Sequence, residues 1–253
     1  MYLIITRSFP PEIGGMQNLM WGLTNELSKS YMIKVFADHH QNNKSFDEKV
    51  SFSIERVGGI KFLRKYRKAH LVNEFIKENK IESIIADHWK SLELVKTNKK
   101  KICLIHGKEI NHEKGTSLNK RFLKVLNNVE IVVANSKYTK ELAVKCGVDG
   151  SKIIVINPGV DLVQELDRKM VNKVEVLLKN NSPRLITVSR FDKRKNHEKI
   201  IMALKNLKQI YPNIIYICIG YGEEEQNIKK LVEELDLKEQ VMFFKDISNE
   251  LKN

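Results

Sequence analysis

Short apolar runs alternate with amphipathic segments of helix length along the chain, and this alternation restricts the possible fold more than any other feature of the sequence. Residues 2–6 are an example, because an unbroken apolar run bounded by turn residues is typical of a parallel strand covered on both faces. We predict strands at residues 2–6, 32–37, 50–57, 81–87, 101–106, 129–135, 152–156, 184–189, 214–219 and 240–244. We predict helices at residues 16–29, 62–79, 116–127, 136–146, 197–210 and 224–235. Such alternation indicates right-handed crossovers and doubly wound parallel sheets.

The predicted elements divide into two halves, and 253 residues are more than one typical domain requires. We predict an α/β protein with two Rossmann-like domains, at residues 1–160 and 183–253, joined by a linker at residues 161–182. The second half has too few strands and helices to complete a doubly wound domain, and it would leave a strand edge and a sheet face uncovered. We therefore expect the second domain to be truncated.

The composition is that of a globular protein with an excess of basic residues. The formal net charge is +13, with a pI near 9.5, which is typical of a protein that binds a polyanion. Nucleic acid, an anionic membrane surface and the phosphates of a substrate all fit this charge. The widely spaced Cys103, Cys146 and Cys218 predict neither a disulfide nor a zinc site. The sequence lacks a signal peptide's apolar core and any run of membrane-spanning length, so we expect a cytoplasmic protein, soluble or peripheral.

The segment Ser189–His197 is the strongest candidate for a binding site. It follows a predicted strand and opens a predicted helix, so that Arg190 and Lys195 lie at a strand-to-helix turn. Backbone N–H groups and the helix dipole favour an anion at such a turn. A planar guanidinium beside a point charge suits a diphosphate, whose charge these groups can neutralise without a metal. Basic residues that are merely solvated at the start of a helix are the alternative interpretation.

Other short segments occur in a characteristic order with this one. They are Gly14-Gly15, His106-Gly107, Ala134–Thr139, Asn157–Asp161 and Arg190–Lys195. In this order and spacing they resemble the GT-B glycosyltransferases, specifically family 4, and the resemblance runs from Met1 to the last residue.

The resemblance implies a retaining, metal-independent glycosyltransferase without a cofactor. Such an enzyme moves a hexose from a UDP- or GDP-sugar to a saccharide or lipid-linked acceptor in envelope polysaccharide biosynthesis, and some relatives work at the inner face of the plasma membrane. In the family, a pair of glutamates that hold the donor sugar and ribose lies beyond the portion present here, which puts the activity of this chain in doubt. A nucleotide-sugar epimerase of the same architecture and an inactive sugar-nucleotide-binding remnant are the alternatives.

The resemblance also assigns roles to residues. It implies catalytic roles for Arg190 and Lys195, at the donor diphosphate, and for His106, which would position the transferred sugar. It implies substrate-binding roles for Gly14, Gly15, Gly220, Gly222, Lys245 and Asp246. Glycines in tight turns and a structural histidine are the alternatives. The sequence departs from the family pattern at Ser189, Asn196 and Lys245, where glycine is usual.

Two further segments have both a functional and a structural interpretation. Asp87, His88 and Trp89 end a predicted strand, where they either line the acceptor side or cap a helix. Residues 61–69 interleave cations with Phe62 and Tyr66 at helical spacing, which fits either an anionic lipid surface or a solvated helix face. The stretch lacks the aromatic platform of single-strand nucleic-acid binders, so we expect no nucleic-acid partner.

Overall fold

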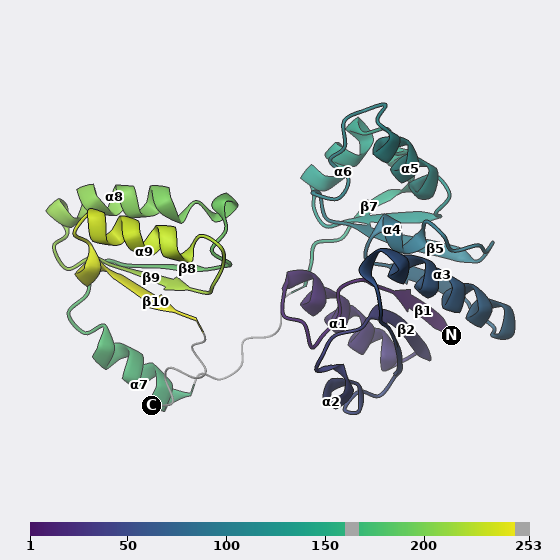
Figure 1. Ribbon diagram of the computed structural model, residues 1–253, viewed down its shortest axis with the longest axis horizontal. Helices are drawn as coiled ribbons and strands as arrows, with labels where there is room; N and C mark the ends of the chain where they lie inside the picture. Colours follow the sequence, from purple (N-terminus) through teal and green to yellow (C-terminus); the bar gives the residue numbers. More distant parts are fainter. Residues whose placement is uncertain (160–166, 246–253) are drawn as a thin grey trace. The chain divides into compact units, whose positions relative to one another are not determined.

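The computed structural model describes residues 1–159 and 167–245. Contacts within the chain group it into two compact units, Met1–Asp161 and Leu162–Asn253. Each unit is built around its own parallel β-sheet (Figure 1). The predicted α/β class with parallel sheets is therefore confirmed. None of the helices in the described ranges is long and apolar enough to cross a bilayer.

The first unit contains a seven-stranded parallel sheet in the order β3-β2-β1-β4-β5-β6-β7. β1 lies in the interior of this sheet, and its Ile4 is paired with Val35 of β2 on one side and Ile85 of β4 on the other. After β3 the chain returns past β1 to form β4 on its other side, so the strand order reverses between β1 and β4. Ligands of open α/β sheets bind at such a switch point. The strands are β1 (Tyr2–Ile5), β2 (Ile33–Asp38), β3 (Ser53–Val57), β4 (Ser83–Ala86), β5 (Lys100–Ile105), β6 (Ile131–Ala134) and β7 (Ile153–Val155).

Two apolar clusters cover the two faces of this sheet. Leu3 and Ile5 belong to one cluster and Ile4 to the other, because successive side chains of a strand point to opposite faces. The cluster of Leu3 and Ile5 packs against α3, α4, α5 and α6, whereas that of Ile4 packs against α1 and α2. The helices are α1 (Gly15–Ser28), α2 (Asn43–Asp47), α3 (Lys61–Glu78), α4 (Trp89–Leu92), α5 (Ser117–Leu126) and α6 (Lys137–Lys145).

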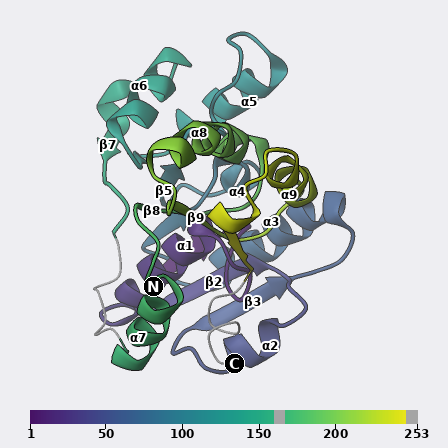
Figure 2. The ribbon, with the colours of Figure 1, turned by 90° about the vertical axis from the view of Figure 1, so that its left-hand side faces the viewer.

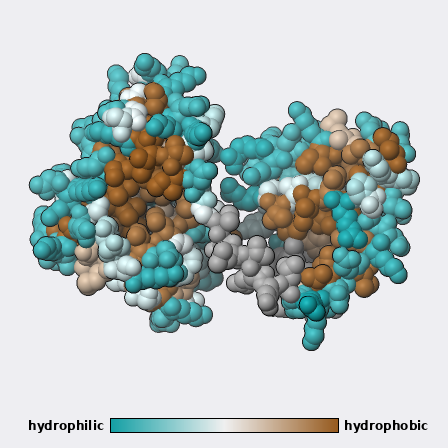
Figure 3. Space-filling model, turned by 180° about the vertical axis from the view of Figure 1, so that it is seen from behind, coloured by the Kyte–Doolittle hydropathy of each residue, from teal (hydrophilic) through white to brown (hydrophobic). Residues whose placement is uncertain are grey.

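The second unit contains a three-stranded parallel sheet in the order β10-β9-β8, made of β8 (Arg184–Val188), β9 (Ile215–Ile219) and β10 (Val241–Phe244). Helices α8 (His197–Ile210) and α9 (Glu225–Glu234) lie on the same face of this sheet, where they share one apolar cluster (Figures 1 and 2). Ile186 and Val188 point to the other face and are 62% and 71% exposed. Apolar residues reach the surface of both units (Figure 3).

The strands and long helices predicted from the sequence are all present, with ends that differ by a few residues. Helix α6 is one residue shorter at each end than predicted, because Ser136 is its N-cap, accepting a hydrogen bond from the Thr139 N–H, and Gly147 follows its C-cap with a φ of 103°. The helices α2 and α4 were not predicted, since five and four residues are too few to show a helical period. An additional helix, α7 (Arg168–Leu177), lies within the expected linker.

Candidate functional site

The loops that follow β8, β9 and β10 are joined by backbone hydrogen bonds at the carboxyl edge of the three-stranded sheet. The Phe191 N–H donates to the Tyr221 carbonyl over 3.0 Å, and the Gly220 N–H donates to the Phe244 carbonyl over 2.7 Å. The Glu224 N–H in turn donates to the Phe191 carbonyl over 3.0 Å. The structure therefore brings together the three predicted segments of the second unit at the edge where open α/β sheets bind ligands.

Gly220 and Gly222 make this close approach of the loops possible. A Cβ on Gly220 would lie 2.0 Å from the Ser189 carbonyl oxygen, and the backbone has a φ of +138° there. A Cβ on Gly222 would lie 2.3 Å from the Phe191 carbonyl oxygen. The packing of the loops therefore requires glycine at both positions, because only a residue without a side chain allows the loop after β9 to lie against the loop after β8.

Arg190 and Lys195 are exposed on the loop after β8. Neither side chain has a hydrogen bond or ion pair with any other residue that the structure describes, whereas Arg194 pairs with Asp192 at 3.2 Å. The loop makes a 3-10 turn at Lys193–Lys195 and then reaches Asn196, whose φ of 57° is one that asparagine tolerates better than most residues. The family's usual glycine at this position fits the same backbone conformation.

Helix α8 begins directly after this turn, and no side chain caps its first N–H groups. Unsatisfied N–H groups and the positive end of the helix dipole attract an anion. The unpaired cations of Arg190 and Lys195 lie on the loop that leads into this helix. The arrangement is suited to neutralising a diphosphate.

A buried polar network holds both ends of the Arg190–Lys195 loop. The two ring nitrogens of His197 lie 3.1 Å from Ser189 Oγ and 2.9 Å from the Tyr216 hydroxyl, which donates to Thr187 Oγ1 over 2.9 Å. His197 is only 2% exposed, and its burial lowers the pKa of the imidazole, against the opposing effect of Asp192. The loop thus begins and ends at residues that share hydrogen bonds.

Lys245 follows β10 and is exposed. Its ammonium lies 3.2 Å from the Glu225 carboxylate, which also pairs with Lys229 at 2.8 Å. The Lys229 hydrogen bond, followed by that of Lys245, keeps the pKa of Glu225 below its usual value. Lys245 is therefore tied to the first turn of α9. Asp246 lies outside the described residues.

The predicted glycines of the first unit lie at the start of α1. Gly14 is the N-cap, and a Cβ there would lie 2.4 Å from the Gln17 Oε1 atom. A Cβ on Gly15 would meet nothing within 4 Å. The first N–H groups of this helix are not capped by a side chain, so α1 also offers donors to an anion.

His106 follows β5 at the carboxyl edge of the seven-stranded sheet and is half-buried. Its backbone N–H donates to the Glu109 carboxylate, whereas its Nε2 atom is buried and has no hydrogen-bond partner among residues 1–159 and 167–245. Gly107 has a φ of +108°, which turns the chain away from the strand. The Nε2 atom of His106 is thus a buried polar atom without a partner in the part of the chain that the structure describes.

Asp87, His88 and Trp89 support the interpretation as a helix cap. His88 Nδ1 accepts a hydrogen bond from the Lys90 N–H at the start of α4, and Trp89 is fully buried. The Asp87 carboxylate accepts hydrogen bonds from Thr6 Oγ1, the Arg7 N–H and Ser91 Oγ, at 2.7, 2.9 and 3.0 Å. Asp87 therefore fixes the loop that follows β1.

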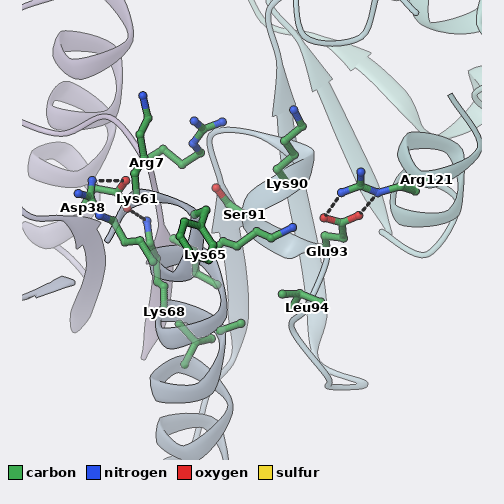
Figure 4. Close-up of a pocket in the computed structure, with 15 residues that line it drawn as sticks. Arg7, Asp38, Lys61, Lys65, Lys68, Lys90, Ser91, Glu93, Leu94 and Arg121 are labelled. Carbon is green, nitrogen blue, oxygen red and sulfur yellow. Dashed lines mark hydrogen bonds and ion pairs between the residues drawn. The ribbon is translucent and has the colours of Figure 1, made fainter. Parts of the chain in front are cut away.

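A cavity of about 390 Å³ in the first unit was not predicted (Figure 4). Its lining includes Lys61 and Lys65 from the basic stretch of α3, together with Arg7, Lys90 and Arg121. Arg7 and Lys90 follow the ends of β1 and β4. Their positions after predicted strands could have marked them in the sequence as candidate ligand-binding residues. Arg121 carries no such signal, because it lies within α5.

Comparisons with known proteins agree with this fold. The family described as Glycosyltransferase Family 4 matches residues 13–164, and that described as Glycosyl transferases group 1 matches residues 169–253. The chain is 22% identical over 260 residues to the GDP-mannose-dependent alpha-(1-6)-phosphatidylinositol monomannoside mannosyltransferase of Mycolicibacterium smegmatis. That match covers 98% of this chain and 68% of the relative.

Solved structures show the same architecture. The Anabaena protein HepE in complex with UDP has a TM-score of 0.78 at 17% identity, over 99% of this chain and 71% of that one. A glycosyltransferase from Rickettsia africae also has a TM-score of 0.78, at 19% identity, over 99% of this chain and 69% of that one. The chain spans about two thirds of the length of the curated relatives it matches. Since the match to residues 13–164 alone covers more than half of the sequence, the chain belongs to glycosyltransferase family 4.

Proposed function

We propose that this protein transfers a hexose from a UDP- or GDP-sugar to a saccharide or lipid-linked acceptor, as a retaining and metal-independent glycosyltransferase of envelope polysaccharide biosynthesis. The observation that carries the proposal is the pair of unpaired cations, Arg190 and Lys195, on the loop that leads into the uncapped start of α8. This is the charge that a nucleotide diphosphate requires of its binding site.

The chemistry of the transfer explains why these cations matter. The bond between the anomeric carbon and the diphosphate oxygen breaks, and the acceptor hydroxyl forms the new bond on the same face of the sugar. Its proton passes to the departing phosphate oxygen. Negative charge builds up on that oxygen in the transition state, so Arg190 and Lys195 accelerate the step by stabilising the leaving group.

We also propose substrate contacts for residues of the first unit. A Cβ on Gly15 would meet nothing within 4 Å, and no side chain caps the first N–H groups of α1, so this end of the helix suits contact with the donor. For His106, whose buried Nε2 atom has no partner among the described residues, we propose a contact with a hydroxyl of the transferred sugar. Gly220 and Gly222 act indirectly in this proposal, since they allow the donor loops to pack together.

The relatives support the choice of substrates. The M. smegmatis protein is named as GDP-mannose-dependent and as acting on a phosphatidylinositol monomannoside, and HepE has been solved with UDP. We propose by analogy a nucleotide-sugar donor and a lipid-linked acceptor for this chain. Ile60, Phe62 and Tyr66 are 59%, 69% and 53% exposed at the start of α3, beside Lys61 and Lys65, which supports action at the anionic inner face of the plasma membrane.

Isothermal titration calorimetry with UDP, GDP, UDP-glucose and GDP-mannose tests the donor site. We expect Arg190→Ala and Lys195→Ala each to weaken binding of the preferred nucleotide by about tenfold to a hundredfold, because each removes charge-assisted hydrogen bonds. Arg194→Ala is the matched control on the same loop, since Arg194 is paired with Asp192. Absence of binding to all four ligands would overturn the proposal.

The anomeric configuration of the product tests retention, and transfer in the presence of EDTA tests metal independence.

A further inference from the structure

The cavity of the first unit lies at the topological switch point of the seven-stranded sheet. Ile5 and Arg7 contribute from the end of β1, Asp38 from the end of β2, and Lys90 and Ser91 from α4, directly after β4. The first turns of α3 close another side (Figure 4). Segments that are far apart in the sequence therefore meet at the edge of the sheet where α/β proteins bind their ligands.

Cations dominate the lining of this cavity, and several of them lack a counter-ion. Asp38 pairs with Arg64 at 3.2 Å and with Lys68, and Glu93 pairs with Arg121 at 2.6 Å. No ion pair with any described residue engages the remaining cations, which are Arg7, Lys61, Lys65 and Lys90. Glu93 acts on Lys65 and Lys90 at longer range, but its ion pair is with Arg121, so the cavity keeps an excess of positive charge that an anionic ligand can neutralise.

The electrostatics of neighbouring groups show that these charges lie close enough to act on one another. Partial burial, followed by the charges of Arg7 and Arg121, lowers the pKa of Lys90. Burial, followed by the charges of Arg7 and Lys90, lowers the pKa of His88 to about 3. An anion in the cavity would relieve this crowding of like charges.

The inner part of the cavity is apolar and its basic floor is fixed. Ala69 and Val72 of α3 line it together with Ile5, and Lys68 is 6% exposed. The Lys68 ammonium donates to the Thr6 carbonyl over 2.6 Å as well as pairing with Asp38, so it is held in place rather than free to bind a ligand. Arg7, Lys61 and Lys65, by contrast, are exposed lining residues.

We propose that this cavity binds a phosphoryl group of the acceptor, so that the sugar is transferred to a phosphorylated molecule. The inference rests on the proposed glycosyl transfer and specifies its acceptor. Four unpaired cations around one cavity match the multiple charges and tetrahedral oxygens of a phosphate better than a single carboxylate. The donor diphosphate has its own proposed site at Arg190 and Lys195, which leaves this second set of cations for the acceptor.

Calorimetry of the full chain with glycerophosphoinositol, inorganic phosphate and uncharged inositol tests the inference. We expect both phosphate compounds to bind and inositol not to bind. Arg7→Gln/Lys65→Gln should weaken phosphate binding by at least about tenfold, because it removes two cationic partners. Lys77→Gln/Lys80→Gln is the control, since it lowers the net charge equally at exposed positions outside the cavity. Equal weakening by both double variants, or no binding of either phosphate compound, would overturn the inference.

Two comparisons separate this inference from the proposed function and from other sources of phosphate. The donor-site variant Arg190→Ala should lose nucleotide binding and retain glycerophosphoinositol binding, whereas Arg7→Gln/Lys65→Gln should do the reverse. Complete displacement of glycerophosphoinositol by UDP would assign the cavity to the donor and refute the acceptor role. Vesicles of phosphatidylcholine with and without phosphatidylinositol distinguish a lipid headgroup from a soluble phosphate. If the protein binds the mixed vesicles and Arg7→Gln/Lys65→Gln weakens this binding, the acceptor is a lipid. If the protein binds only the soluble probes, the acceptor is a water-soluble phosphate.

Discussion

The imidazole of His197 and the hydroxyl of Tyr216 share a buried hydrogen bond of 2.9 Å. Through the other ring nitrogen of His197, this contact continues to Ser189, next to Arg190. The position of the proposed diphosphate site therefore depends on a polar group inside the second unit.

Replacing His197 by Phe should lower the free energy of unfolding by about 1 to 3 kcal/mol, because the Tyr216 hydroxyl loses a partner in a buried environment. The ring volume is retained, so the loss reports the hydrogen bonds. Nucleotide affinity should fall as well, since Ser189 is no longer held beside the loop. Urea denaturation and calorimetry measure the two effects. His197→Asn, which restores one polar contact, should recover part of the affinity; equal affinity in all three proteins would contradict the positioning role.

Acidification should destabilise the first unit through His88. Its folded-state pKa of about 3 lies below the ordinary value of 6.5, so the unfolded chain binds the proton more tightly. The contribution to stability is complete above pH 6.5 and is lost as the pH falls toward 3. His88→Asn retains a cap for α4 without a titrating group, and it should flatten this part of the stability profile. The exposed His70, replaced in the same way, is the control and should leave the profile unchanged.

Gly222→Ala should destabilise the second unit by about 1 to 3 kcal/mol, because the new methyl group collides with the Phe191 backbone. Gly15→Ala should change the stability by less than about 0.5 kcal/mol, since the space there is open. Thermal unfolding measures both. If Gly15→Ala nevertheless weakens nucleotide binding, the loss supports a donor contact at this residue; unchanged affinity would argue against that contact.

Asp87→Ala should lower the free energy of unfolding by about 2 to 4 kcal/mol, because it removes the acceptor of three hydrogen bonds from a position that is only 2% exposed. It should also weaken phosphate binding, since the loop that carries Arg7 loses its anchor. Asp149→Ala, at an exposed turn, is the comparison and should have little effect on either quantity. A stable Asp87→Ala protein would show that the loop is fixed by other contacts.

The strands and long helices could be predicted because the residues that they bury recur in the sequence as a periodic pattern of apolar side chains. The strand-turn-helix context of Arg190 and Lys195 followed from the same pattern. The network of Ser189, His197 and Tyr216 could not be predicted, since it depends on the register between β8 and β9 and on the rotamer of a buried ring. Gly220 and Gly222 were expected near a nucleotide, and the structure adds the backbone contacts that require them.

The basic cavity was missed for a topological reason. Arg7 and Lys90 are brought together only because β4 pairs with β1, a neighbour that is not consecutive in the sequence. Local patterns cannot reveal such a pairing. The basic stretch of α3 was considered as one surface, whereas the structure directs Arg64 and Lys68 toward Asp38 and leaves Lys61 and Lys65 at the cavity.

The neutral imidazole of His88 has a consequence for how the cavity would respond to pH. His88 gains no proton until about pH 3, so its charge does not change near neutrality. A change in affinity near neutrality would then come from the bound molecule or from the lining lysines Lys68 and Lys90, whose pKa values are lowered by burial. A phosphate monoester, whose second ionisation lies near pH 6, gains charge as the solution becomes alkaline and would bind more tightly, whereas a diester gains none. A titration could thus reveal the esterification of the acceptor before its sugar is known.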